Sequence, residues 1–254
     1  MIKGSRFLGK FLKMSLAALS ICLLTSAIAF QIDNRRLRHR AEQLIADFGM
    51  LNVDESTLTD VLRFHSRWRG EIYDGKACEE SHCTLYFSQD SYIVGHTTKY
   101  MPQGMYDRAP IWRILLLLGA RPASIQVWLE IRDGKLSSKM LKLYVEAPPK
   151  SFEEQILVGQ LSANNANSKP VSPSSHVIVD CGVGSTTFHP LLDTGGGVSS
   201  PTIFVQCKPN GKEKMRQLAH FNLDCLTGWR VCRTQADLMP EAWAAYQKDF
   251  KNLN

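Results

Sequence analysis

The first 32 residues are dominated by one long apolar segment. Met14–Ile32 is a run of 19 residues without a formal charge. Four basic residues precede it: Lys3, Arg6, Lys10 and Lys13. A helix of this length spans about 28 Å, close to the hydrocarbon thickness of a bilayer. A basic flank before an apolar run is typical of a signal peptide or of a signal anchor, so we expect the chain to contact the membrane through residues 14–32.

Two fates of this segment compete. Ala27-Ile28-Ala29 fits the small-residue pattern of a cleavage site, and cleavage there leaves Phe30 as the new N-terminus of a secreted or periplasmic protein. We favour retention as a single transmembrane helix with the domain outside the cytoplasm, because the run is long for a signal-peptide core. Basic residues directly after the run count against either exported topology, and a reversed orientation or a helix packed inside the protein are the remaining alternatives. These residues are Arg35, Arg36, Arg38 and Arg40.

The helical pattern continues beyond the apolar run. No Pro or Gly occurs between Met14 and Phe48, which predicts one continuous helix. Its second half carries an apolar stripe at helical spacing: Leu37, Ala41, Leu44, Ile45 and Phe48. A second, short helix is predicted over Asp54–Phe64, with Asp54 or Ser56 as its N-terminal cap.

Strand patterns dominate the middle of the chain. Cys83–Val94 has alternating apolar positions, and so has the segment around Ile125–Ile131. Asp133-Gly134 follows, and Leu136–Val145 returns with the same period, which predicts a β-hairpin with an Asp-Gly turn.

The apolar stretch Ile111–Ala120 is too short to span a membrane and is flanked by Arg121. We expect this stretch to be a buried helix. The helical segment is predicted over Asp107–Leu118, with Pro110 in its first turn and Gly119 just past its end.

The C-terminal part begins after a polar segment. Residues 162–175 are rich in Asn, Ser and Pro and are expected to form a loop or linker. Strands are predicted over His176–Cys181 and Thr202–Cys207, and Leu218–Leu226 fits a strand or a helix. Leu238–Phe250 is predicted to be the last helix.

The order of these elements predicts an α+β fold: an N-terminal transmembrane or signal helix, then antiparallel β-hairpins packed on a few helices. The predicted parts are a signal anchor or signal peptide (1–32), an α+β region with a hairpin (33–161), a loop (162–175) and a β-rich region ending in a helix (176–254).

The net charge of +6 is misleading about the domain. Subtracting the four basic residues of the N-terminal flank leaves 26 basic against 24 acidic residues. A nearly neutral domain does not match nucleic-acid binding, which needs a basic surface, so we expect no nucleic-acid partner.

The cysteines indicate an oxidising compartment. Six follow the apolar segment, and proximity favours the disulfides Cys78–Cys83, Cys181–Cys207 and Cys225–Cys232 among fifteen pairings. The alternative is a zinc site, whose soft ligands would be Cys78, His82, Cys83, Cys225 and Cys232.

One short motif suggests chemistry. Leu191–Gly195 contains Asp193-Thr194-Gly195 and resembles the signature of retropepsin-like aspartic proteases, which implies that Asp193 would share a proton with a second aspartate across a dimer. Pro190 and Gly196-Gly197 depart from that pattern, so we expect a glycine-rich turn.

Gly182–Thr186 has no lysine for a phosphate loop, and no serine or cysteine nucleophile pattern occurs. We predict no catalytic residue, metal or cofactor. The expected function is non-enzymatic: a membrane-anchored or exported binding or assembly domain of the cell envelope, of unknown protein or small-molecule partner. The alternative is an exported hydrolase that uses Asp193.

Overall fold

The computed structural model describes residues 3–68, 71–72, 78, 81–91, 115–147, 155–165, 181–188, 200–227 and 232–251. The helices are α1 (Lys3–Met50), α2 (Leu58–Trp68), α5 (Lys212–Leu218), α6 (Gln235–Leu238) and α7 (Pro240–Lys251), with 3₁₀ turns η1 (Pro209–Gly211) and η2 (Leu223–Leu226). The strands are β1 (Glu71–Ile72), β2 (His82–Asp90), β3 (Ala123–Arg132), β4 (Lys135–Ala147), β5 (Gln155–Asn164), β6 (Gly182–Phe188) and β7 (Ser200–Cys207).

The strands form one mixed sheet in the order β1-β2-β3-β4-β5-β7-β6, with six long strands and the two-residue β1 at one edge. The α+β prediction is confirmed. The expectation of a purely antiparallel sheet is wrong at one place, because β5 and β7 are parallel. Strand β6 lies between them in sequence but occupies the outer edge of the sheet, which brings β7 next to β5.

The connection between β3 and β4 follows from its turn residues. Asp133 has φ of 51° and Gly134 has φ of 72°, and both values lie in the left-handed region. Two such residues make the tight turn whose twist matches that of antiparallel strands. The turn sets the pairing of Ile131 with Leu136, and an irregularity between Glu130 and Ile131 then shifts the register by one residue, so that Leu129 lies opposite Lys139.

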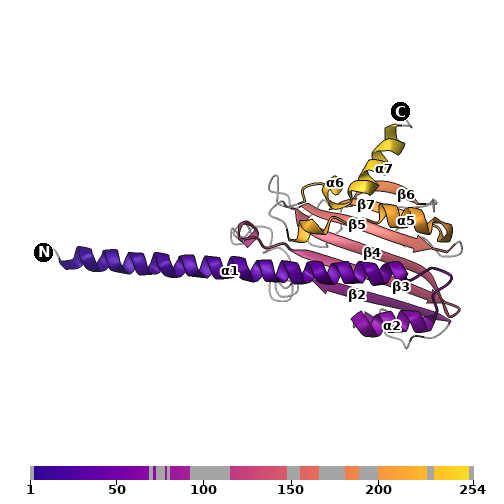
Figure 1. The fold of residues 1–254 in the computed structure, drawn as a ribbon, viewed down its shortest axis with the longest axis horizontal. Helices are drawn as coiled ribbons and strands as arrows, with labels where there is room; N and C mark the ends of the chain where they lie inside the picture. Colours follow the sequence, from indigo (N-terminus) through magenta and orange to yellow (C-terminus); the bar gives the residue numbers. More distant parts are fainter. Residues whose placement is uncertain are drawn as a thin grey trace.

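One face of the sheet forms the core of the domain. Every second residue of the central strands points to this face and is buried, as expected for a sheet covered on that side by helices. The C-terminal half of α1 lies across it, with α2 on one side and α5 and α6 on the other (Figure 1). The fully buried strand residues include Leu85, Phe87, Ile125, Leu129, Ile131, Leu141, Leu143, Leu157 and Leu161.

Helix α1 has two halves with different surroundings. It is continuous from Lys3 to Met50, which confirms the predicted single helix. Leu37, Ala41, Leu44 and Phe48 of the predicted stripe are buried against the sheet, and Ile45 packs at the edge of that core. The N-terminal half projects beyond the sheet (Figure 1) and is long and apolar enough to cross a membrane, a property that signal sequences share. Both the apolar helix and the cysteine pairs described below are compatible with an anchored or exported protein.

The start of α2 differs from the prediction. The helix begins at Leu58, after Thr57, whose hydroxyl accepts a hydrogen bond from the backbone N–H of Asp60 at 3.3 Å, while the Asp60 carboxylate accepts from the N–H of Thr57 at 3.0 Å. This reciprocal pair is a capping box. Asp54 does not cap the helix, because its φ of 65° places it in a turn, and Ser56 accepts from the N–H of Asn52 instead.

The segment before β3 is helical over residues 115–117, and Gly119 follows it with φ of 96°, as predicted. The expectation of a buried helix is wrong at Leu117, which is 82% exposed. Residues 107–114 of the predicted helix lie outside the described part of the chain.

The C-terminal segment folds back over the sheet. Leu218–Leu226, predicted as a strand or a helix, contains the end of α5, four residues without regular secondary structure, and η2. The predicted last helix corresponds to α7, and Pro240 is in its first turn.

The predicted loop 162–175 begins later than expected. Strand β5 extends through Asn164, so the first three residues of that loop are strand. Residues 166–180, which include the rest of the loop and all of the predicted strand at 176–181 except Cys181, lie outside the described residues.

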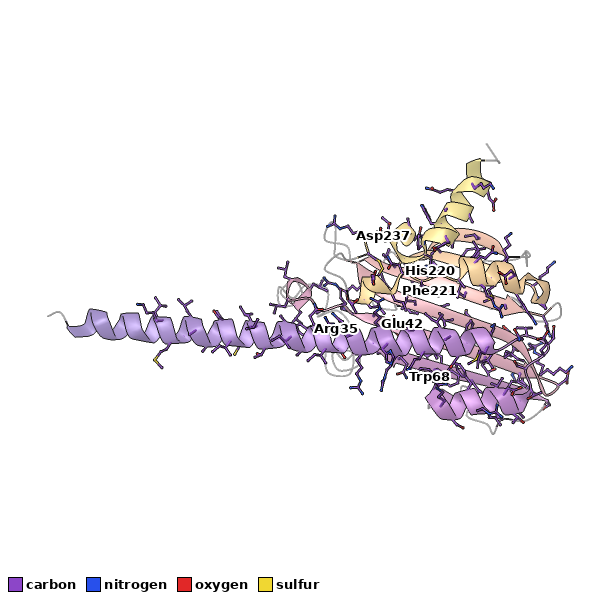
Figure 2. All side chains as sticks on the ribbon, viewed as in Figure 1. Arg35, Glu42, Trp68, His220, Phe221 and Asp237 are labelled. Carbon is purple, nitrogen blue, oxygen red and sulfur yellow. A yellow bond between two sulfur atoms is a disulfide. The ribbon has the colours of Figure 1, made fainter. Side chains whose placement is uncertain are left out.

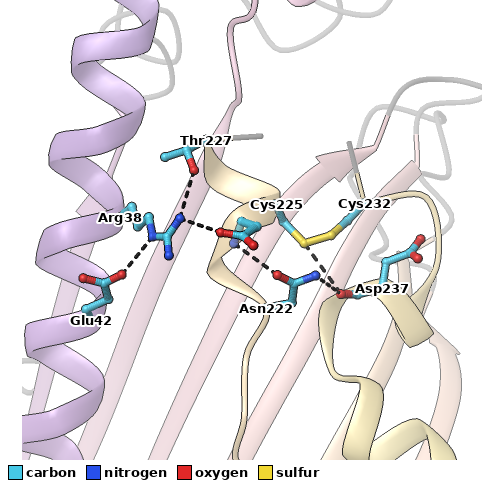
Figure 3. Close-up of polar contacts among 8 residues, drawn as sticks. Arg38, Glu42, Asn222, Cys225, Thr227, Cys232 and Asp237 are labelled. Atoms are coloured by element: carbon cyan, nitrogen blue, oxygen red, sulfur yellow. Dashed lines mark hydrogen bonds and ion pairs between the residues drawn. A yellow bond between two sulfur atoms is a disulfide. The ribbon is translucent and has the colours of Figure 1, made fainter. Parts of the chain in front are cut away.

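A polar bridge fastens the C-terminal segment to α1 (Figure 3). The guanidinium of Arg38 donates to Glu42 at 2.8 Å in its own helix and to Asp224 at 2.5 Å in η2. The pKa of Arg38 is raised, first by its hydrogen bond to Glu42 and also by Asp224. Within the C-terminal segment, the side-chain amide of Asn222 donates to the Asp237 carbonyl at 3.0 Å and joins η2 to α6.

The predicted cysteine pairs all lie at disulfide distance. They are Cys78–Cys83, Cys181–Cys207 and Cys225–Cys232, and Cys22 is free. The cysteines of the alternative zinc site are therefore committed to disulfides, and the described residues contain no group of three or more metal-ligating side chains.

Candidate functional site

A cavity of about 210 Å³ opens between the C-terminal end of α1 and the segment that joins β7 to α5. The sheet supplies its floor, and the last turns of α1 and the side of α5 supply its walls. Its main apolar lining residues are Ile45, Phe48, Leu51, Leu161, Ala163 and Met215. Apolar walls with a few polar groups are the usual composition of a small-molecule site.

One charged side chain lies on the floor of this cavity. Lys139 of β4 is opposite Leu129 of β3 and Ala163 of β5, so it points to the helix-covered face of the sheet. Its Nζ donates to the carbonyl oxygens of Phe48 at 2.9 Å and Leu51 at 2.5 Å. Carbonyl groups at a helix C-terminus have no partner within the helix and favour a positive charge. Lys139 therefore fixes the end of α1 to the sheet.

The ammonium group of Lys139 can donate one more hydrogen bond besides these two. A lysine ammonium carries three N–H donors. Nζ also lies 4.4 Å from the centre of the Phe48 ring, a cation–π distance. Among the described residues, no carboxylate lies within ion-pair distance of Lys139 and no third acceptor binds it. The remaining N–H is available to an acceptor that enters the cavity.

The charge of Lys139 is costly in this position. Burial lowers its pKa to about 8, and the positive charges of Lys212 and Arg216 act in the same direction. The group is protonated at neutral pH but close to losing its proton. An anion bound beside Nζ would stabilise the ammonium form and raise this pKa again.

Three more cationic side chains line the cavity toward solvent: Lys208, Lys212 and Arg216. Two of them have acidic neighbours, since Lys212 forms an ion pair with Glu55, and Arg216 lies 3.8 Å from Glu213. These neighbours are exposed and compensate the rim cations only in part, because exposed ion pairs are weak. The cavity thus combines an apolar wall with a net positive floor and rim.

No family model, curated protein or solved structure matches this chain. The function proposed for the cavity therefore rests on its own geometry and charge.

The residues that the sequence singled out are distributed differently. Asp193 lies outside the described residues, so the protease-like motif and the hydrolase alternative stay predictions. Gly182–Thr186, considered as a phosphate loop, belongs to strand β6. His82 is the exposed first residue of β2, beside the Cys83 disulfide.

Lys139 was not among the residues predicted from the sequence, although the alternation of β4 contains a signal for it. Leu141, Leu143 and Val145 form the buried row of this strand, and Lys139 lies two residues before them in the same row. A lysine in the buried, otherwise apolar row of a strand is unusual and marks a candidate site.

Proposed function

We propose that the protein is a membrane-anchored binding domain of the cell envelope, whose cavity binds a small apolar carboxylate outside the cytoplasm. Residues 14–32 of α1 serve as a single transmembrane anchor, and the helix then continues into the core of the domain. We assign no chemical step to the site, because each of the cavity residues described above has a role in binding the ligand.

The observation that carries this proposal is the Lys139 ammonium on the cavity floor. It has one N–H without an acceptor among the described residues, and the adjoining walls are apolar. A carboxylate would accept this N–H in a charge-assisted hydrogen bond, while its hydrocarbon chain replaces water along Phe48 and Leu161. A neutral ligand of the same shape gains only the free energy of burying its hydrocarbon chain.

The test is calorimetric titration of the whole chain in lipid nanodiscs with decanoate, against empty nanodiscs as the blank. Decanol is the uncharged reference ligand. We expect Lys139→Met to weaken decanoate binding about 10- to 100-fold, the range for a hydrogen bond between charged groups, and to change decanol binding little.

The matched control is Lys142→Met. This lysine belongs to the same strand but lies in the opposite row, opposite Gln126 and over the ring of Trp128, away from the cavity. It should leave the affinity for decanoate unchanged. Equal affinity for decanoate and decanol, or full affinity in the Lys139→Met variant, would show that the cavity is not an anion site.

Binding should also depend on pH. The folded-state pKa of Lys139 is about 8, below the ordinary lysine value of 10.5, so its positive charge is present below pH 8 and lost as the pH rises through it. The other charged groups at the site are Lys208, Lys212, Arg216, Glu55 and Glu213, and none is a histidine, the residue type that ordinarily titrates near neutral pH. Decanoate affinity should be flat from about pH 6 to pH 7.5 and fall by up to about tenfold per pH unit above pH 8. The decanoate affinity of the Lys139→Met variant should not fall with rising pH. If its pH dependence were identical to that of the wild type, the fall would be due to a group other than Lys139.

A further inference from the structure

The exposed apolar turn before β3 lies against the helix that is proposed to cross the membrane. The helical residues Leu115–Leu117, followed by Gly119 and Ala120, emerge beside α1 at the end of the sheet nearest its N-terminal half (Figure 1). Phe30 of α1 packs together with Leu115 and Leu116 around the buried Ala120. This contact falls within the last three residues of the charge-free run that ends at Ile32.

Specific polar contacts hold the turn beside this part of α1. The side-chain amide of Asn34, itself buried, donates to the carbonyl of Gly119 at 2.8 Å. Gly119 has φ of 96°, a backbone conformation that strains any residue with a side chain and so favours glycine. The turn is thus docked on one turn of α1 between Phe30 and Asn34.

A buried arginine fixes the shape of the turn itself. Arg121 donates from Nη1 to the carbonyls of Leu116 at 3.1 Å and Ala120 at 2.6 Å. The backbone N–H of Gly119 bonds to Leu116 at 3.1 Å, and that of Ala120 bonds to Leu115 at 3.0 Å. These hydrogen bonds fix the backbone of the turn. The side chain of Leu117 points outward and is 82% exposed.

The N-terminal half of α1 also exposes apolar side chains. Leu24, Ile28 and Ile32 are 63%, 52% and 64% exposed on the N-terminal half of the helix. Figure 2 places Arg35 close to the edge of the sheet from which α1 emerges, so the positive charges begin just where the apolar surface ends. The turn lies at the same level along the helix, between the apolar run and the first arginines.

We infer that the turn Leu115–Ala120 is a second membrane contact, which inserts Leu117 into the headgroup–acyl boundary of the bilayer that holds α1. The inference rests on the proposed transmembrane role of residues 14–32. Apolar side chains at this boundary add binding in proportion to the area that they remove from water. Because the turn is bonded to α1 and leads directly into β3, this contact also fixes the tilt of the sheet relative to the membrane.

The test places an environment-sensitive fluorophore at single cysteines of the whole chain in nanodiscs, in a Cys22→Ser background. The variants are Leu117→Cys, Leu24→Cys as the membrane reference and Met50→Cys as the distal reference. Met50 is 68% exposed and lies about 27 Å beyond Ile32 along α1. The nanodiscs are phosphatidylcholine, alone or with spin-labelled lipids whose quenchers lie near the headgroups and at the middle of the acyl chains.

We expect the spin-labelled lipids to quench the labels at positions 24 and 117 about two-fold or more, and to leave the label at position 50 unchanged. Quenching at 24 with none at 117 overturns the second contact and leaves the anchor intact. Absence of quenching at both 24 and 117 overturns the anchor as well. Because Leu117 is exposed, its replacement leaves the packing of the turn unaltered, and a loss of signal cannot be ascribed to unfolding.

Discussion

The Leu44→Ala substitution is expected to lower the free energy of unfolding of the domain by about 2–5 kcal/mol, or its melting temperature by about 10 °C. Leu44 is fully buried between α1 and the sheet, so the shorter side chain leaves a cavity in the core. This loss is a large share of the roughly 5–15 kcal/mol that typically stabilises a domain. Thermal unfolding of the detergent-solubilised chain, followed by tryptophan fluorescence, measures it.

The same substitution elsewhere in the same helix is the control. Leu19 is 55% exposed and lies in the half of α1 that projects beyond the sheet, so Leu19→Ala should leave the melting temperature of the domain unchanged. Equal effects of the two substitutions, or none from Leu44→Ala, would mean that α1 is not part of the core of the domain.

The second large effect is expected from the disulfide that joins the edge strand β6 to its neighbour β7. Cys181 precedes β6 and Cys207 ends β7, and both are buried. Replacing both by Ala should lower the free energy of unfolding by about 3 kcal/mol, because the disulfide closes a loop with a sequence separation of 26 in the unfolded chain. The Cys225–Cys232 pair has a sequence separation of 7 and should contribute less, about 2 kcal/mol.

Counting thiols gives an independent check of the same disulfides. Alkylation of the denatured, non-reduced chain should modify one of its seven cysteines, namely Cys22. Seven alkylated cysteines in the mass spectrum would remove the disulfides and with them the predicted loss of stability.

The features that the sequence predicted correctly are local or periodic. The continuity of α1 follows from the absence of Pro and Gly, and its buried stripe from spacing alone. The three cysteine pairs follow from proximity, since each joins neighbours in the chain. These signals do not depend on how distant parts of the chain meet.

The features that the sequence did not predict depend on long-range pairing. Strand β7 lies parallel to β5 although β6 separates them along the chain, and no local pattern encodes this order. The cap of α2 was misplaced, because the position of Asp54 depends on a backbone hydrogen bond to Leu136 of β4. The role of Lys139 likewise appears only when α1 brings the carbonyls of Phe48 and Leu51 to it.

The exposure of Leu117 illustrates a different limit. A run of leucines predicts burial in a protein core, but an apolar side chain can also be buried in lipid. The membrane contact proposed for Leu117 is supported by the docking of the turn on α1, through Asn34 and Gly119, which are 85 residues apart in the chain.

The central claim is that α1 is one helix that both anchors the protein in the membrane and completes the core of the domain. The most direct test is the intact mass of the chain recovered from alkaline-washed membranes of cells that express it. We expect the uncleaved chain of 28.6 kDa in the membrane pellet. A soluble chain that begins at Phe30, or the whole chain in the soluble fraction, would contradict it.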